Sequence, residues 1–484
     1  MENKQLKTPV IDMLKDFENK TEGYFCIPSH HRGTGTDEKF REIIGDTLRY
    51  DLTETPLTDD LHEPEGAILE AQELAAELFG AKKTFFLVNG TTCANEAMII
   101  SSVYKNEKIL VARNCHKSVL MGLIISGAEP IYIEPQKSSL FNTFGSVSPE
   151  SVEEAFKKHS GIKACILTSP TYYGITSDLK SIAEICHKNN ALLLVDEAHG
   201  SHLAFSDKLP LSAIQSGADM AAQSIHKTLG SMTQTSMLHV NNGDFARVDA
   251  ALKIVQSTSP SYILMASLDG ARHNMAVNGK ELIENMVETA DYLREKLSGI
   301  DGVFCPCEAD GKEVFDFDRT RLVFSVKGLT GFEVSDRLVE KHGIVTELAD
   351  NYSVVAIIGH ADTKEDADRL IKAVTEIAEY GKTKEHTVNS FEYPEVPPMA
   401  MLPRTIFFSP SKRIDFKDCI GTISAEMIAP YPPGIPVIYP GEIITPDVHE
   451  FLTKAIEEGR HIHGFSDKTM KTIQIIRYDK NIEK

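Results

Sequence analysis

The sequence predicts an α/β protein built on a mainly parallel sheet with helices on both of its faces. Two observations support this prediction: between residues 66 and 242 apolar runs alternate with helical patterns, and several of the runs are apolar at every position. Strands buried on both faces are typical of parallel sheets covered by helices. The runs expected as strands are 84–88, 108–112, 130–134, 164–168, 191–195, 218–222 and 236–240.

The first helix of this region is expected ahead of the strands. Ala71, Leu74, Ala75 and Leu78 follow the spacing of one helical face, and Gly80 supplies a stop signal. Further helices are expected over residues 93–104, after the first strand, and 263–297, after the last. Between residues 320 and 380 two strand-like and two helix-like runs alternate again, which predicts a smaller α+β domain.

The length of 484 residues favours several domains. We expect an N-terminal segment over 1–65, a large α/β domain over 66–305, a small α+β domain over 306–390 and a C-terminal domain over 391–484. Ligands of open α/β sheets bind beyond the carboxyl ends of the strands. The residues that directly follow the expected strands are therefore the first place to look for a site.

The composition is acidic, with 50 Lys and Arg against 70 Asp and Glu and a net charge of −20. Such a surface repels phosphate backbones, which argues against a nucleic-acid partner, and it favours small cationic substrates. The eight cysteines form no CxxC pair, as expected of reduced thiols in the cytoplasm. A polar start and the lack of any apolar run of about 18 residues predict a cytoplasmic protein without a membrane span.

A lysine motif, Ser224-Ile225-His226-Lys227, follows the expected strand 218–222. A lysine at a strand end can form an imine with a carbonyl compound while its hydroxyl and imidazole neighbours bind an anion. A solvated surface lysine is the alternative, and this motif alone leaves both open.

An acidic motif, Asp196-Glu197-Ala198-His199, follows the buried run 191–195. A buried carboxylate without a cationic partner costs several kcal/mol, so this position favours a bound cation such as the protonated ring nitrogen of pyridoxal phosphate. The alternative is the magnesium-binding acid of a helicase. That function also needs a GxxxxGK[ST] phosphate loop, which the sequence lacks.

A turn of small residues, Asn89-Gly90-Thr91-Thr92, lies between the expected strand 84–88 and a helix. The free N–H groups of a helix start, together with two hydroxyls, favour phosphate binding. The alternative is that Thr91 or Thr92 only caps the helix. The turn, the acid and the lysine, found in this order along the chain, indicate a cofactor site more specifically than any one of the three motifs does.

Together these residues resemble the fold-type I pyridoxal-phosphate enzymes, whose fold is like that of aspartate aminotransferase. Within that group the sequence is most similar to the bacterial ornithine/lysine/arginine decarboxylases, in the short form without a wing domain. The last of the matching segments is distinctive for this branch. The segments are PSHHRG (28–33), DLTETPLTDDLHEPEG (51–66), FLVNGTT (86–92), RNCHKSV (113–119), TSPTYYG (168–174), DEAHG (196–200), SIHKTLG (224–230) and GTISAEMIAPYPPGIPVIYPGE (421–442).

The resemblance implies a role for each motif residue within a cofactor-binding large domain. Lys227 would hold pyridoxal 5′-phosphate covalently and later protonate the product carbanion, and Asp196 would pair with the ring nitrogen. Ala198 and His116 would pack on the two faces of the ring, and His199 would lie near its phenolic oxygen. The phosphate contacts would come from Gly90, Thr91, Thr92, Ser224 and His226.

The implied activity is decarboxylation of a basic amino acid. Arginine, giving agmatine for polyamine biosynthesis, is the first expectation, and lysine and ornithine are alternatives. Two further alternatives are an α-oxoamine synthase and a non-catalytic regulatory homologue. Family members of this fold have active sites at subunit interfaces, so a homodimer or larger homo-oligomer is expected.

Glu426, in the distinctive segment, is the predicted partner of the substrate's distal cation. Its segment is rich in proline, so a stiffened connection between strands is the alternative. Asp60, with Asp59 and His62, is a second candidate that the other subunit could donate.

No metal site is expected, because none of the clusters of potential ligands completes a set of four. These clusters are His30-His31, His461/His463 and Cys305/Cys307.

Overall fold

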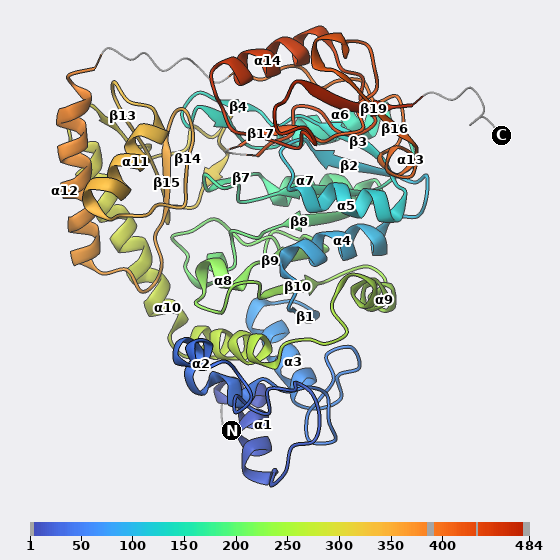
Figure 1. Cartoon of the computed structure of the whole chain (residues 1–484), viewed down its shortest axis with the longest axis vertical. Coiled ribbons are helices and arrows are strands. Elements are labelled where there is room, and N and C mark those ends of the chain that lie inside the picture. Colours follow the sequence, from blue (N-terminus) through green and yellow to red (C-terminus); the bar gives the residue numbers. More distant parts are fainter. Residues whose placement is uncertain (1–3, 385–391, 432–433, 478–484) are drawn as a thin grey trace.

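Seven strands form the central sheet of the computed structural model, in the order β1-β10-β9-β8-β6-β2-β3 (Figure 1). The structure describes residues 4–384, 392–431 and 434–477. All neighbouring strands run parallel except β10, which is antiparallel to both β1 and β9. The predicted, mainly parallel sheet is therefore confirmed. The strands are β1 Lys83–Leu87, β2 Lys108–Ala112, β3 Glu129–Ile133, β6 Ile162–Thr168, β8 Leu192–Asp196, β9 Met220–Gln223 and β10 Ser236–Val240.

Every run expected as a strand overlaps one of these seven, but several ends are displaced. The expected strand 218–222 begins only at Met220. Asp219 instead anchors the chain before the strand: its N–H donates to the carbonyl of Leu193, and its carboxylate accepts from the N–H of Leu193 at 2.7 Å. A side chain that bonds to a neighbouring backbone in this way replaces the ladder of a strand.

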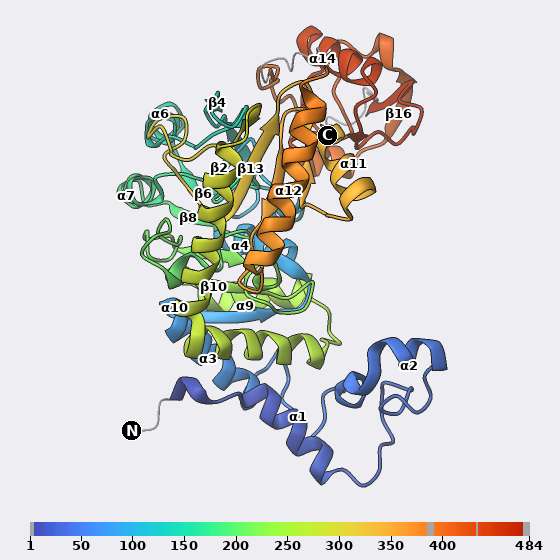
Figure 2. The same cartoon turned by 90° about the vertical axis from the view of Figure 1, so that its left-hand side faces the viewer.

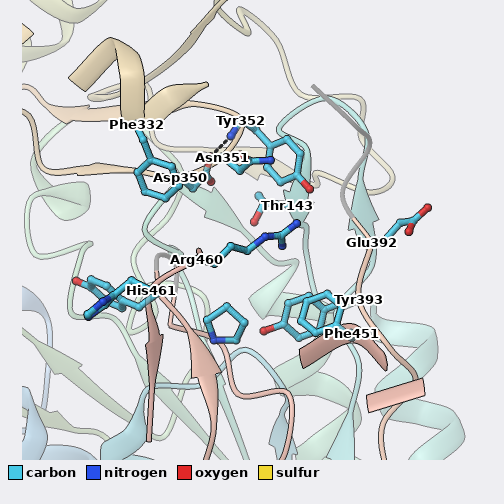
Figure 3. Close-up of a pocket in the computed structure, with 12 residues that line it drawn as sticks. Thr143, Phe332, Asp350, Asn351, Tyr352, Glu392, Tyr393, Phe451, Arg460 and His461 are labelled. Atoms are coloured by element: carbon cyan, nitrogen blue, oxygen red, sulfur yellow. Dashed lines mark hydrogen bonds between the residues drawn. The ribbon is translucent and has the colours of Figure 1, made fainter. Parts of the chain in front are cut away.

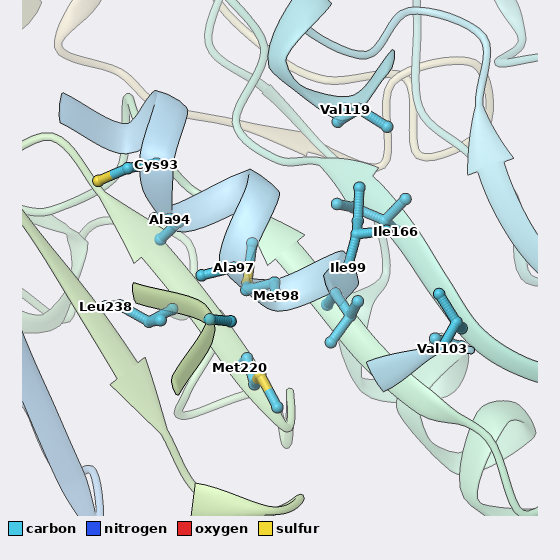
Figure 4. Close-up of a cluster of buried hydrophobic side chains, with 14 of the residues drawn as sticks. Cys93, Ala94, Ala97, Met98, Ile99, Val103, Val119, Ile166, Met220 and Leu238 are labelled. Carbon is cyan, nitrogen blue, oxygen red and sulfur yellow. The ribbon is translucent and has the colours of Figure 1, made fainter. Parts of the chain in front are cut away.

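Helices cover both faces of the sheet. On one face α4, α5 and α9 pack on side chains such as Val111, Ile166 and Leu238, and Figure 4 shows the α4 part of this cluster. On the other face α6 and α7 pack on Leu110 and Val195. The helices are α4 Gly90–Ser102, α5 Lys117–Ser126, α6 Pro149–Lys158, α7 Leu179–Lys188 and α9 Phe245–Val255. Residues at strand ends are thus held between two packed layers.

The helix expected around residues 71–78 is confirmed as α3, Ala67–Phe79. Gly80 closes it in the left-handed conformation, with φ of 76°. The helix expected over 93–104 is α4, which begins at Gly90, so the predicted phosphate turn is itself the first turn of the helix. The alternative that Thr91 or Thr92 caps α4 is wrong, because Asn89 occupies the N-cap position.

A second, antiparallel sheet has the order β11-β13-β15-β14 (Figure 1). Helix α10, Tyr262–Ser298, runs from the central sheet to this one (Figure 2). The two strands and two helices expected over 320–380 are β13, β15, α11 and α12, whereas the short strands β11 and β14 were not expected; the limits of the four domains stay a prediction. The elements are β11 Val303–Phe304, β13 Arg321–Val326, β14 Leu348–Ala349, β15 Val354–Ile357, α11 Gly331–His342 and α12 Lys364–Gly381.

The two ends of the described chain lie at opposite ends of the molecule, and in Figure 2 α2 stands away from the rest. The N-terminal elements are η1 Lys4–Leu6, α1 Pro9–Lys20, α2 Glu38–Ile44 and η2 Gly45–Tyr50. The C-terminal elements are α13 Pro403–Phe407, β16 Ser411–Asp415, η4 Phe416–Asp418, β17 Ala429–Pro430, α14 Pro446–Glu457, β18 Ile462–His463 and β19 Thr472–Ile476. Short elements elsewhere are β4 Lys137–Ser138, β5 Thr143–Phe144, β7 Ile175–Thr176, η3 Leu203–Phe205, α8 Ile225–Thr228 and β12 Asp316–Phe317.

A buried ion pair joins the C-terminal segment to the end of β2. Nη2 of Arg113 donates to Oε2 of Glu442 at 2.8 Å, and Nη1 bonds to Oε1. The guanidinium also lies 4.9 Å from the ring centre of Tyr132 and 4.5 Å from that of Tyr439.

Among the residues described, no helix has both the length and the apolar character needed to cross a bilayer.

Candidate active site

The predicted lysine and acid come together at the carboxyl edge of the central sheet. Asp196 is the last residue of β8, and Lys227 lies on α8, directly after the neighbouring strand β9. Nζ of Lys227 is 3.0 Å from Nε2 of His199, three residues beyond Asp196. Because β8 and β9 are parallel and adjacent, residues that follow them are brought to one place.

Asp196 is a buried carboxylate, 3% exposed. Its Oδ2 accepts from Nδ2 of Asn95 at 2.7 Å, and its Oδ1 accepts from the N–H of Ala198 at 3.2 Å. No Lys, Arg or His in the described ranges comes within ion-pair distance of it. A buried carboxylate that has only neutral donors fits a cationic group of a ligand.

Lys227 is half-buried, and within the described residues it forms no ion pair. Burial lowers its pKa, and nearby Arg321 lowers it further, while Asp196 and Glu347 act in the opposite direction. The ring of Tyr172 lies 5.5 Å from its Nζ. These surroundings argue against the alternative of a solvated surface lysine and favour a nucleophile.

His199 is buried between three side chains. Nη2 of Arg321 donates to the His199 carbonyl at 2.9 Å, and Nδ1 of the His199 ring lies 3.4 Å from the same nitrogen. The ring of Tyr172 packs at 4.4 Å between centroids. Burial, with Lys227 and Arg321, holds the pKa of His199 well below its ordinary value, so the imidazole is neutral.

His116 is the N-cap residue of α5, and its Nδ1 accepts from the N–H of Ser118 at 3.3 Å and bonds to Oγ of Ser118 at 2.8 Å. Asn95 donates to the same hydroxyl oxygen, so one amide connects Asp196 with the hydroxyl that holds His116. Burial lowers the pKa of His116, and Asp196 and Lys227 both influence it. The imidazole therefore has a fixed orientation in the same site.

Three hydroxyls gather near the start of α4. Oγ1 of Thr91 lies 2.6 Å from Oγ of Ser224 and 3.0 Å from Oγ of Ser236. Gly90 opens the helix with φ of 73°, and its neighbouring N–H groups lack partners within the helix. Hydroxyls at a helix start favour a phosphate. His226 bonds through Nδ1 to the carbonyl of Thr235 at 2.7 Å.

The donor set fits pyridoxal phosphate. Within the described ranges Asp196 has no ion-paired cation and Lys227 has no ion-paired acid, and hydroxyls gather at a helix start. These three features suit the ring nitrogen, the aldehyde and the phosphate of the cofactor. The described chain brings together no three His, Cys, Asp or Glu side chains that could hold a metal ion.

Sequence reasoning missed Asn95, Ser236, Tyr172 and Arg321. Asn95 follows Thr91 by one helical turn, and Tyr172 lies in a matching segment, so both had a local signal. Ser236 and Arg321 enter only through the pairing of β10 and the position of β13, which no short motif reveals.

The two predicted substrate carboxylates have other partners in the structure. Glu426 is 7% exposed, and its oxygens accept from the N–H groups of Ser466 at 2.8 Å and Gln474 at 3.2 Å. Asp60 accepts from the N–H of His62 in a local turn. Their substrate roles stay predictions. Pro432 and Pro433, in the proline-rich segment, lie outside the described residues.

A pocket lies between the second sheet and the C-terminal segment (Figure 3). Its lining includes Asp350, Arg460 and Tyr431 but neither Lys227 nor Asp196. Tyr431 contributes to the raised pKa of Tyr172, about 12, whose main cause is burial. The pocket is therefore adjacent to the active-site group rather than identical with it.

Comparisons with known proteins agree with this geometry. The family model described as Orn/Lys/Arg decarboxylase, major domain, matches residues 8–366, and the model of the C-terminal domain of that family matches residues 384–475. A protein named arginine decarboxylase from Halalkalibacterium halodurans is 41% identical over 98% of this chain and 99% of its own. One of the same name from Bacillus subtilis is 40% identical over 99% and 100%.

A solved structure, that of the Francisella novicida lysine decarboxylase LdcF, superposes with a TM-score of 0.84. The match covers 98% of this chain and 82% of that chain, at 22% identity. This likeness confirms the predicted fold class.

Proposed function

Because the chain belongs to the Orn/Lys/Arg decarboxylase family, we propose that it is a pyridoxal-phosphate-dependent carboxy-lyase that converts arginine to agmatine and carbon dioxide. The observation that carries this proposal is the position of Lys227 and the buried Asp196 at one edge of the sheet. The choice of arginine rests on the relatives of that name, which are about 40% identical over nearly the whole chain.

When bound, pyridoxal phosphate supplies an electron-poor ring that accepts the electron pair of the broken Cα bond. Lys227 would hold its aldehyde carbon, and Asp196 would keep the ring nitrogen protonated. Thr91, Ser224 and Ser236 would hold the phosphate together with the start of α4.

The protein's own residues then orient the substrate and move a proton. His116 and Ala198 would confine the ring between them. With the ring fixed, the bond from Cα to the α-carboxylate can be held perpendicular to the ring plane. An apolar setting around that carboxylate favours neutral carbon dioxide over the charged acid. Lys227 would return a proton to the carbon that carbon dioxide leaves.

Carbon dioxide release from arginine, lysine and ornithine tests the activity and the substrate together. We expect the highest kcat/KM with arginine and no release with Lys227→Ala. Faster release from lysine or ornithine would move the assignment to that amino acid. No release from any of the three by the cofactor-loaded protein would contradict decarboxylase function and favour the synthase or regulatory alternatives.

We keep Glu426 as the proposed partner of the substrate's distal cation. Glu347 is the second carboxylate to test, by comparing the KM of the two Gln variants. Glu347 is exposed and influences the pKa values of Lys227 and Arg321, so a carboxylate near the lysine exists without Glu426. Glu426→Gln is expected to raise KM for arginine at least tenfold, in line with a charge-assisted bond of about 1.5–3 kcal/mol. A raised KM in Glu347→Gln alone would transfer the role to Glu347.

We also propose that the protein works in the cytoplasm as a homodimer or a larger homo-oligomer, without nucleic acid or membrane partners. Large apolar side chains of the N-terminal segment support an interface between copies: Phe25 is 98% exposed, Ile43 80% and Ile27 62%. Light scattering on the purified protein is expected to give at least twice the mass of one chain, and a monomer at micromolar concentration would contradict this.

A further inference from the structure

Arg321 connects the second sheet to the active-site group. It is the first residue of β13, and its side chain is 1% exposed. Its Nη2 donates to the carbonyl of His199 at 2.9 Å and lies 3.4 Å from Nδ1 of the same residue. Nη1 is 3.8 Å from Oδ2 of Asp318. Within the described part of the chain, Nε and Nη1 have no hydrogen-bond acceptor, so the hydrogen bonds of this guanidinium are directed at His199.

The chemistry of the guanidinium decides where the proton of His199 lies. Arginine donates hydrogen bonds and cannot accept them, so Nδ1 of His199 must be the accepting nitrogen. A neutral imidazole carries one proton, which is then on Nε2. Nε2 is 3.0 Å from Nζ of Lys227, and its N–H therefore donates to the lysine nitrogen. Only an unprotonated amine has the lone pair to accept it.

The opposite arrangement conflicts with Arg321. If Lys227 were an ammonium group, it would donate to Nε2, and the imidazole proton would have to lie on Nδ1. That proton would point at an N–H of Arg321, which can only donate. The chain of contacts thus favours one protonation pattern.

We propose that Arg321 is a positioning residue that fixes the tautomer of His199 and thereby keeps Lys227 as the neutral amine that receives the cofactor's aldehyde. This inference rests on the proposed function, since it concerns how the lysine becomes ready to bind pyridoxal phosphate. Attachment joins the lysine nitrogen to the aldehyde carbon and releases one water. It therefore requires the unprotonated amine.

The charges around Lys227 are consistent with this role. Burial is the main cause of its lowered pKa, Arg321 adds to it, and Asp196 and Glu347 oppose it. The other facing groups are neutral or aromatic: His116, His199 and His226 have pKa values lowered mainly by burial, and Tyr172 lies with its ring toward the amine. Arg321 is thus the one cation among the described residues that the pKa of Lys227 depends on.

The test measures how fast the cofactor-free protein attaches pyridoxal phosphate at different pH values. Attachment is followed by visible absorbance and by mass after borohydride reduction. In Arg321→Met we expect the midpoint of the pH profile to rise by about one unit, so that the rate at a pH well below the midpoint, where it is proportional to the unprotonated fraction, falls about tenfold. The limiting rate at high pH should change far less. Arg321→Lys keeps a cationic donor and should restore much of the wild-type profile.

Arg272→Met is the matched control. Arg272 is also 1% exposed and paired, with Asp269 at 2.8 Å, but it lies on α10 and contacts the N-terminal segment. The Arg272→Met variant should lose stability as Arg321→Met does, but the midpoint of its pH profile of cofactor attachment should stay unchanged. An unchanged midpoint in Arg321→Met, or an equal shift in both variants, would overturn the inference.

A measurement on the unaltered protein avoids any folding defect of the variants. In protein labelled with ¹⁵N-histidine, the His199 ring of the cofactor-free form should show a proton on Nε2 and none on Nδ1. A proton on Nδ1 would refute the role of Arg321. If the unaltered protein attaches no pyridoxal phosphate at all, the proposed function itself fails, which is a different outcome from an unshifted profile.

Discussion

At the scale of single residues, the site depends on burying ionisable groups beside neutral partners. Asp196 has an amide and a backbone N–H as partners, and Lys227 has an imidazole. Neither side chain has an ion-pair partner of opposite charge within the described protein, which leaves both available to a ligand. A structural ion pair would have joined them directly instead.

Glu197, the neighbour of Asp196, gives a pH dependence of stability. Its carboxylate is fully buried and accepts from the N–H of Ala213 and from Gln223, yet burial raises its pKa to about 8. Between the ordinary value of 4.5 and about 8 the folded protein holds a proton that the unfolded chain has released. The free energy of unfolding should therefore fall by a few kcal/mol as the pH rises through this window.

Glu197→Gln removes this titration, so its unfolding free energy should depend less on pH between 5 and 8. The slope is the quantity to compare, because the new amide also meets two donors and shifts stability at every pH. Urea unfolding at several pH values measures the slope. Glu184→Gln, at an exposed position on α7, is the control and should keep the slope of the unaltered protein. Parallel slopes for Glu197→Gln and the unaltered protein would show that Glu197 is ionised in the fold.

Motifs could predict those residues whose chemistry is indicated by a few neighbouring positions in the sequence. Lys227 and Asp196 each follow a buried run, and the strand order then places them together. Arg321 could not be found in this way, since it lies 94 positions after Lys227 and reaches the site through the packing of a separate sheet. For Glu426 the sequence could not reveal that two backbone N–H groups, 40 and 48 positions further along the chain, occupy the carboxylate.

At the scale of elements, the helices and strands with strong periodicity were predicted closely. Helix α12, Lys364–Gly381, is one of the two helix-like runs expected between residues 320 and 380, because its apolar positions repeat with the helical period and Thr363 caps its start. The direction of β10 could not be predicted. Its apolar residues are buried whichever way the strand runs, and only its connections to β9 and β1 decide the direction.

The end of α3 offers a test at this scale. Gly80 adopts φ of 76° in open space, so an added methyl group would be strained without meeting another atom. Gly80→Ala should lower the free energy of unfolding by about 1–2 kcal/mol. Gly270→Ala, inside α10 and facing only Ile11 at 3.5 Å, should instead be neutral or stabilising by up to about 1 kcal/mol. Urea unfolding compares them, and equal effects would contradict this account of the helix end.

At the scale of the whole molecule, the C-terminal segment is fixed to the central sheet close to the site. Arg113, which directly follows β2, lies three residues before His116 and binds Glu442 in a buried pair. The same guanidinium lies between the rings of Tyr132 and Tyr439. The C-terminal segment therefore supports the loop that carries His116.

Breaking this pair should destabilise the protein strongly. Glu442→Gln leaves a buried guanidinium without its acid, which costs about 3–5 kcal/mol, whereas Asp301→Asn removes one of two exposed partners of Lys382 and should cost less than about 1 kcal/mol. Thermal and urea unfolding measure both. A loss below 1 kcal/mol in Glu442→Gln would show that the C-terminal segment does not depend on the pair.

The proposed activity requires one covalent bond, between the amine at position 227 and the aldehyde of pyridoxal phosphate. Borohydride reduction of the loaded protein, followed by mass spectrometry of its peptides, identifies the modified residue directly. We expect one pyridoxyl phosphate group on Lys227 and none in Lys227→Ala. Labelling of another lysine, or equal labelling of the Ala variant, would contradict it.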